Sequence, residues 1–174
     1  MKVLRETSLT KVLADWGRHE ALGRFSSNIT PSQKHELSGP NGEGRAIETL
    51  FKWRGPVLFP ILLAHAKRFL SIEVLPDDII HLRILGRPSK PLAVAVSSED
   101  QRIDQDNTYI SRLASAQNQL QGPLLAVARN ADGPFILLDG IHRAIAWILQ
   151  AERGNSYPMV LNVVITQEQV RGWE

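Results

Sequence analysis

The sequence predicts an α+β protein, in which a small mixed sheet with flanking helices follows a helical N-terminal extension. Three observations lead to this prediction. Two short apolar runs, 123–128 and 134–138, stand on either side of a turn-forming segment, and an apolar stripe at helical spacing follows them. A third apolar run, 159–165, comes after the stripe. Strand, turn, strand, helix and strand in this order are typical of a compact α+β unit.

The turn between the first two runs is Arg129-Asn130-Ala131-Asp132-Gly133. Asn, Asp and Gly supply the positive φ values and local side-chain bonds that a hairpin turn requires. The second run leads into Asp139 and Gly140, and apolar residues then recur every three or four positions up to Gly154. The pattern therefore predicts a hairpin that opens directly into a helix.

The first third of the chain predicts helices. Ser8 precedes an apolar stripe over 9–22, which favours one amphipathic helix. Segment 26–44 is rich in Ser, Asn, Pro, Gly and Gln, so we expect a flexible loop there, followed by a short helix over 45–53. We divide the chain into an N-terminal helical extension, 1–55, and one domain, 56–174.

The middle of the chain supplies the other predicted elements. Segment 69–75 favours a strand, and the residues from Pro76 begin a turn or short helix. Segment 92–96 is a further strand candidate, and 108–120 favours a helix.

The amino-acid composition excludes several kinds of chemistry and of location. The chain has no cysteine, which excludes disulfides, a thiol nucleophile and cysteine-ligated metals. Its longest apolar stretch, 56–66, is too short to span a bilayer, and the N-terminal residues lack the apolar core of a signal peptide. We therefore expect a cytoplasmic protein without membrane insertion. The excess of Lys and Arg over Asp and Glu lies in residues 1–55. This excess is compatible with an ordinary solvated surface and with contact to nucleic acid.

The helix start is the candidate binding site. A helix that begins directly after Asp139-Gly140 leaves backbone N–H groups at the positive end of its dipole, an arrangement that suits an anion. His142 and Arg143 fall in the first turn, next to Ile141, where both side chains could close on a phosphate. The alternative is purely structural: Asp139 as N-cap, Gly140 as turn residue, His142 as a satisfied, partly buried histidine and Arg143 as a solvated charge.

The string LLDGIHRAIAW, with two strands before it and the strand-like PMVLNVVI after it, resembles the ParB/sulfiredoxin fold family. Members of that family place a G-x-H-R-like motif at a helix start to hold nucleotide phosphates. The resemblance covers residues 70–166 in outline and 121–154 closely. Ile141 stands where sulfiredoxin has its catalytic cysteine, so the resemblance implies nucleotide binding without thiol chemistry.

The resemblance implies an ATP-type nucleotide, or another NTP, as ligand, with Mg²⁺ for hydrolysis. Gly140, Ile141, His142 and Arg143 would bind phosphate, together with Arg87, which we expect on a loop between two strands. Asp139 would orient water, His142 would protonate a leaving oxygen, and Arg143 would stabilise the charge on the transferred group. Asp104 and Asp106 are candidate metal ligands, although acidic residues before a helix are commonly solvated.

The branch that the chain most resembles in size contains the plasmid-encoded oncogenic-suppression and fertility-inhibition proteins. This resemblance implies ATPase activity, which could extend to DNA binding and DNase activity. It also implies that the protein inhibits the transfer of DNA or effector proteins and contacts a component of a type IV secretion system. Too few residues follow Ile165 for the DNA-reading domain of a ParB clamp. Two alternatives stay open: an ATP-dependent kinase of serine type, and a non-catalytic inhibitory module that uses the helix 9–22.

Overall fold

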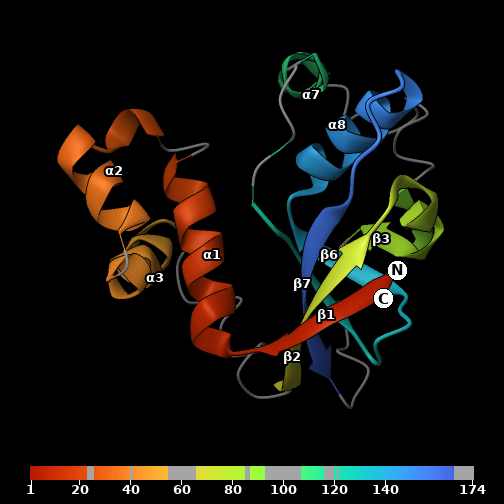
Figure 1. The fold of residues 1–174 in the computed structure, drawn as a ribbon, viewed down its shortest axis with the longest axis horizontal. Coiled ribbons are helices and arrows are strands. Elements are labelled where there is room, and N and C mark those ends of the chain that lie inside the picture. Colours follow the sequence, from red (N-terminus) through yellow and green to blue (C-terminus); the bar gives the residue numbers. More distant parts are fainter. Residues whose placement is uncertain are drawn as a thin grey trace.

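The chain forms an α+β fold built on one seven-stranded mixed sheet (Figure 1). The structure is a computed structural model that describes residues 1–22, 26–39, 41–54, 66–84, 87–92, 107–115, 120 and 122–166. Its strand order is β1-β2-β7-β5-β6-β3-β4. The strands are β1 (Lys2–Thr7), β2 (Ala66–Val74), β3 (Leu82–Ile84), β4 (Arg87–Pro91), β5 (Leu124–Ala128), β6 (Phe135–Asp139) and β7 (Met159–Thr166). The helices are α1 (Leu9–Leu22), α2 (Pro31–Ser38), α3 (Gly42–Arg54), α7 (Asn107–Ala114) and α8 (Ile141–Glu152), with 3₁₀ turns η1 (Ser26–Asn28) and η2 (Pro76–His81).

The predicted hairpin, helix and final strand are confirmed at the centre of the sheet. β5 and β6 pair antiparallel, and in the turn between them the side chain of Asn130 accepts a hydrogen bond from the backbone N–H of Asp132 at 2.9 Å. α8 then carries the chain across the sheet, so β7 lies parallel to β5. The crossover buries Trp147 completely, and its indole N–H donates to the carbonyl of Tyr157 at 2.9 Å.

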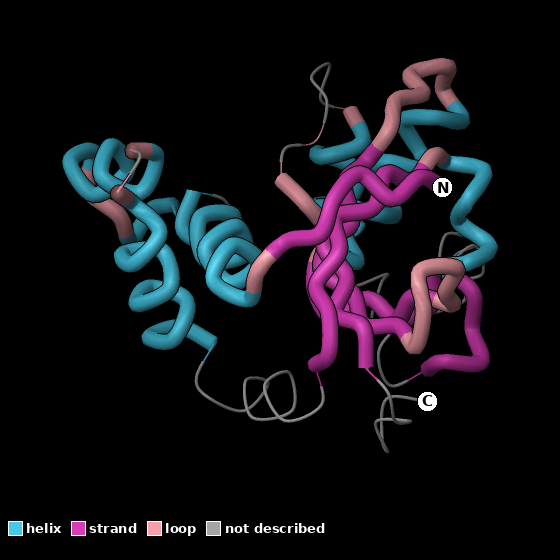
Figure 2. Tube along the Cα trace, turned by 60° about the horizontal axis from the view of Figure 1, so that its bottom comes forward, coloured by secondary structure: helices cyan, strands magenta, loops and turns pink. Residues whose placement is uncertain are grey.

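Helices cover both faces of the sheet (Figures 1 and 2). On one face α7 and α8 pack on the larger apolar cluster, which contains Trp147, Phe135 and Leu161. On the other face α1 and α3 pack on a smaller cluster that includes Trp16 and Val164. Because successive strand residues point to opposite faces, the strands of the hairpin contribute to both clusters.

The N-terminal segment differs from the prediction in two places. α1 is confirmed, but it is preceded by β1, a strand that we did not predict and that pairs antiparallel with β2 at the edge of the sheet. The prediction of a loop over 26–44 is wrong where this segment forms the helix α2 and the first turn of α3. α2 begins with a capping box, in which the Thr30 hydroxyl accepts from the Gln33 N–H and the Gln33 side chain accepts from the Thr30 N–H. Leu37 is buried and holds this otherwise polar helix against its neighbours.

In the middle of the chain, β2 and η2 agree with the predicted strand and turn, and α7 agrees with the first part of the helix predicted over 108–120 but ends at Ala114. Arg87 was expected on a loop but lies in β4, and Arg83 lies in β3. The strand expected over 92–96 falls outside the described residues except for Leu92, which is buried. None of the described helices combines the length and the apolar character needed to cross a membrane.

Candidate functional site at the start of helix α8

Gly140 sets the geometry at the start of α8. It is the N-cap residue and has φ 89° and ψ 17°, in the left-handed region that residues with a Cβ avoid. Its carbonyl accepts the first helical bond, from the N–H of Ala144 at 2.8 Å. A Cβ here would lie 2.6 Å from Cδ2 of the buried Leu124. Both the backbone conformation and the packing therefore require glycine.

Asp139 and Arg143 form a buried ion pair. Nη2 of Arg143 donates to Oδ2 of Asp139 at 3.2 Å, and Nη1 donates to the carbonyl oxygens of Gly122 and Pro123 at 3.0 and 3.1 Å. Arg143 is only 5% exposed. Burial lowers the pKa of its guanidinium, and the carboxylate of Asp139 opposes this shift. The pair ties the loop before β5 to the first turn of α8.

This arrangement rules out one of the readings of Asp139 that the sequence left open, the N-cap. The N-cap is Gly140, not Asp139, and α8 starts without a side-chain cap. The Asp139 carboxylate contacts Arg143 instead. Arg143 is likewise not a solvated charge, because three protein acceptors surround its guanidinium.

The last turns of α1 bring two residues to this ion pair that sequence reasoning missed. His19 lies beside Gly122, where a Cβ would be 3.0 Å from the imidazole Nδ1. The pKa of His19 is lowered to about 4, chiefly by burial and secondly by the charge of Arg143, while the charge of Asp139 opposes the shift. His19 is therefore neutral at pH 7. Glu20 is 3% exposed, and its charge raises the pKa of Arg143.

Tyr109 of α7 closes another side of the site. Its ring meets that of His142 edge-on, with 6.0 Å between the ring centroids. The guanidinium of Arg112 lies 5.5 Å from the centre of the same tyrosine ring. His142 is half-buried in the first turn of α8, next to Ile141, whose side chain packs against the larger apolar cluster. α1, α7, α8 and the loop before β5 thus all contribute to the site.

Three predicted site residues remain, Arg87, Asp104 and Asp106. β4, which contains Arg87, is separated from β6 by β3. Asp104 and Asp106 lie outside the described residues. No group of three or more His, Asp or Glu side chains that could hold a metal ion occurs among the residues whose positions are given. The described residues therefore do not by themselves provide a Mg²⁺ site.

Sequence signals for His19 and Glu20 were weak. Glu20 continues the spacing of Val12 and Trp16, so a carboxylate falls on the apolar stripe of the predicted helix. This is the one sign that the helix carries a buried charge.

Comparisons of this chain with protein-family models, with curated proteins and with solved structures found no match.

Proposed function

We propose that this chain is a nucleotide-binding protein of ParB/sulfiredoxin type, and that the first turn of α8 receives a phosphate group of an ATP-type nucleotide. One observation carries the proposal: a strand ends at Asp139 and a twelve-residue helix begins at once from a left-handed glycine. In this arrangement the first backbone N–H groups stand at the positive end of the helix dipole, as they do at many phosphate sites.

Within this proposal the predicted residues have different roles. Arg143 is a positioning residue, because its bonds to Asp139 and to the loop before β5 fix the helix start. Contact with phosphate then falls to the backbone of Ile141 and His142 and to the half-buried imidazole of His142. An imidazole can donate to phosphate in either protonation state, because one ring nitrogen carries a proton even when the ring is neutral. ATP hydrolysis, with Asp139 orienting water, is the catalytic extension of the proposal.

A second candidate, a non-catalytic inhibitory module, is favoured by a specific observation. The Arg143 guanidinium already donates to one carboxylate and two carbonyls inside the protein. An arginine that holds a loop and a helix together in this way has a sufficient structural role without a ligand. In that case inhibition of DNA transfer would rest on contact with a secretion component.

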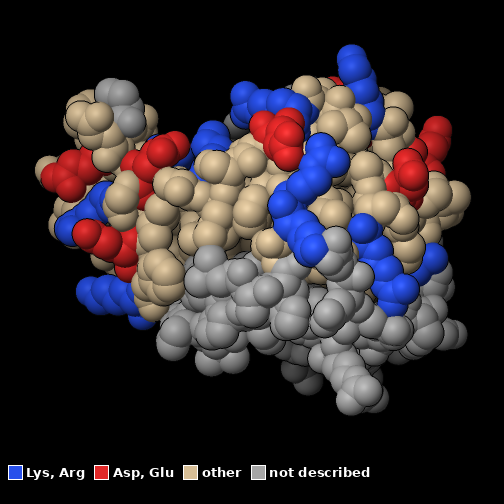
Figure 3. Space-filling model, turned by 90° about the horizontal axis from the view of Figure 1, so that it is seen from below, with Lys and Arg blue, Asp and Glu red and all other residues tan. Residues whose placement is uncertain are grey.

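DNA binding is the part of the proposal that the surface supports least. Lys and Arg side chains lie across the face seen in Figure 3, but Asp and Glu side chains lie among them. Some exposed basic residues are also paired: Arg68 of β2 forms an ion pair with Glu6 at 3.0 Å. We therefore propose nucleotide binding as the main activity and DNA cleavage as a less supported one.

The test is calorimetric titration of the protein with ATP and with CTP, in the presence of Mg²⁺. His142→Ala should weaken nucleotide binding about ten- to a hundredfold, because a hydrogen bond to a charged group contributes about 1.5–3 kcal/mol. His35→Ala, at an exposed position on α2, is the matched control and should bind as the wild type does. If the wild type binds neither nucleotide, the proposal is wrong and the non-catalytic module is favoured.

Further assays separate the activities. Release of inorganic phosphate from ATP, lost in Asp139→Asn, would support hydrolysis, whereas binding without release would restrict the proposal to binding. Phosphate transferred to added serine would instead support the kinase. Nicking of a supercoiled plasmid tests the DNase extension directly.

A further inference from the structure

α1 covers only part of its face of the sheet, and the uncovered part forms a groove. Val164 of β7 lies under α1 and is fully buried, whereas Val160, four residues earlier on the same face, is 38% exposed. Between them lies the paired row of Ser71 and Asn162. A cavity of about 690 Å³ opens over this row, bounded by α1, β1, the loop before β5 and the segment that leads into β7.

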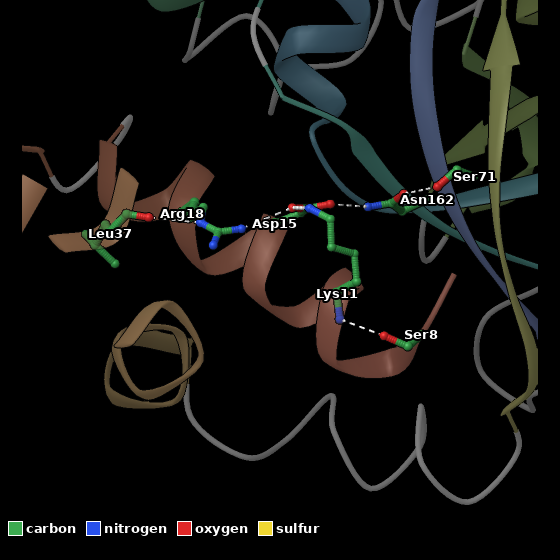
Figure 4. A network of polar contacts seen from close by, with 7 residues as sticks. All are labelled: Ser8, Lys11, Asp15, Arg18, Leu37, Ser71 and Asn162. Carbon is green, nitrogen blue, oxygen red and sulfur yellow. Dashed lines mark hydrogen bonds and ion pairs between the residues drawn. The ribbon is translucent and has the colours of Figure 1, made fainter. Parts of the chain in front are cut away.

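The floor of this groove is polar although it is buried. Ser71 and Asn162 are 4% and 3% exposed. The Ser71 hydroxyl donates to Oδ1 of Asn162 at 3.0 Å, and Nδ2 of Asn162 donates to Oδ2 of Asp15 at 3.4 Å (Figure 4). A row of apolar side chains would suit a sheet face that only had to pack against a helix. A Ser–Asn–Asp chain on this face instead presents hydrogen-bonding groups to the cavity.

Asn162 has hydrogen-bonding capacity to spare. Its amide carries two N–H groups, and the described residues provide an acceptor, Asp15, for one of them. The Ser71 oxygen donates its proton to Asn162 and keeps its lone pairs as acceptors. The floor can therefore donate to one ligand oxygen and accept from a ligand hydroxyl.

The rim is positively charged. Asp15 is the acidic residue of the lining, and it forms ion pairs with Lys11 and with Arg18 (Figure 4). Arg5 of β1 also lines the cavity, is exposed, and forms no ion pair with any part of the chain that the structure describes. The balance at the groove therefore favours an anion.

We propose that this groove binds a small hydroxylated anion, of the sugar-acid or sugar-phosphate class, at a site separate from the start of α8. The anionic group meets Arg5 at the rim, and the hydroxyl groups meet Ser71 and Asn162 on the floor. Tyr157 and Pro123 line the cavity as well and offer apolar surface to the carbon skeleton. The volume falls within the range of pockets that hold small organic ligands, about 300–1,000 Å³.

The experiment uses ¹H–¹⁵N spectra of the full chain, with the side-chain amide signal of Asn162 as the readout. The probes are D-gluconate and D-ribose 5-phosphate, which distinguish a carboxylate ligand from a phosphate ligand. Acetate, inorganic phosphate and D-ribose are the controls, since each lacks either the hydroxyl groups or the charge. We expect one of the two hydroxylated anions to shift the Asn162 signal with a Kd of about 1 mM or lower, and each control to bind at least tenfold more weakly.

Variants make the proposal falsifiable. Arg5→Ala removes an exposed side chain, so the fold is retained, and the affinity should fall about tenfold. Arg68→Ala is the matched control on the adjacent strand and should leave the affinity unchanged. His142→Ala should also leave it unchanged, which separates this site from the start of α8. Absence of a shift with both anions, equal binding of the controls, or an unaltered affinity in Arg5→Ala would each overturn the proposal.

Discussion

Replacing Gly140 by alanine tests whether the start of α8 is as tightly built as its geometry indicates. The left-handed conformation costs a residue with a Cβ about 1–2 kcal/mol. The new Cβ would also lie 2.6 Å from Leu124 Cδ2, although carbon atoms prefer about 3.5–4.0 Å. Leu124 is fully buried and has little room to move, so overpacking adds about 1–3 kcal/mol. We expect Gly140→Ala to lower the free energy of unfolding by about 2–5 kcal/mol in total.

Two other glycines serve as controls in the same urea titrations, followed by circular dichroism. Gly154 has nearly the same φ, 87°, but a Cβ there would meet nothing within 4 Å, so Gly154→Ala should show the backbone cost alone. Gly44 also has open space around it and lies within α3, so Gly44→Ala should stabilise the protein by about 0.5–1 kcal/mol. A loss in Gly140→Ala no larger than that in Gly154→Ala would refute the proposed packing.

Three further predictions concern buried polar groups. Arg143→Met should lower the free energy of unfolding by about 3–5 kcal/mol, because it leaves the Asp139 carboxylate without its ion-pair partner. Arg68→Met, which removes an exposed ion pair, should lower it by less than about 1 kcal/mol in the same urea titrations. The unfolding free energy should fall as the pH is lowered from about 6.5 towards 4, by up to about 1.4 kcal/mol per pH unit. The reason is that His19 takes up a proton in this range when the chain is unfolded, whereas in the folded protein its pKa is lowered to about 4 and it stays neutral. A pH series in which His19→Gln keeps the full wild-type slope would contradict this. Tyr157→Phe should cost about 1–3 kcal/mol, since the hydroxyl donates to Gln150 Oε1 at 2.6 Å and accepts from the Leu120 N–H at 2.9 Å; an unchanged melting curve would count against both bonds.

The sequence predicted those parts of the fold in which pattern and local chemistry agree. The central hairpin has its turn residues, and α8 has both an apolar stripe and glycines at its two ends. β1 gave no such signal, because its side chains are almost all exposed and lack alternation. α2 was read as a loop from its composition, although Thr30 and Gln33 formed a capping box that the sequence displayed.

The sequence could predict only those parts of the candidate site that are formed by residues close together in the chain. The turn at Gly140 and the first turn of α8 follow from neighbouring residues. The partners of Arg143 do not, because the carbonyls of Gly122 and Pro123 carry no side-chain signature and lie about twenty residues earlier. His19 reaches the site only because α1 packs on the sheet, a contact that no short-range pattern encodes.

Sequence separation within the sheet has a consequence for how the molecule assembles. β5, β6, α8 and β7 come from one continuous stretch, whereas Ser71 and its partner Asn162 are 91 residues apart, and Asp15 and Asn162 are 147 apart. Closing such long loops costs more chain entropy than closing the hairpin, so the C-terminal stretch should condense first and the N-terminal strand and helices should dock last. His19, Asp15 and Arg5 all arrive with that final docking, so the two proposed sites exist only in the fully folded chain.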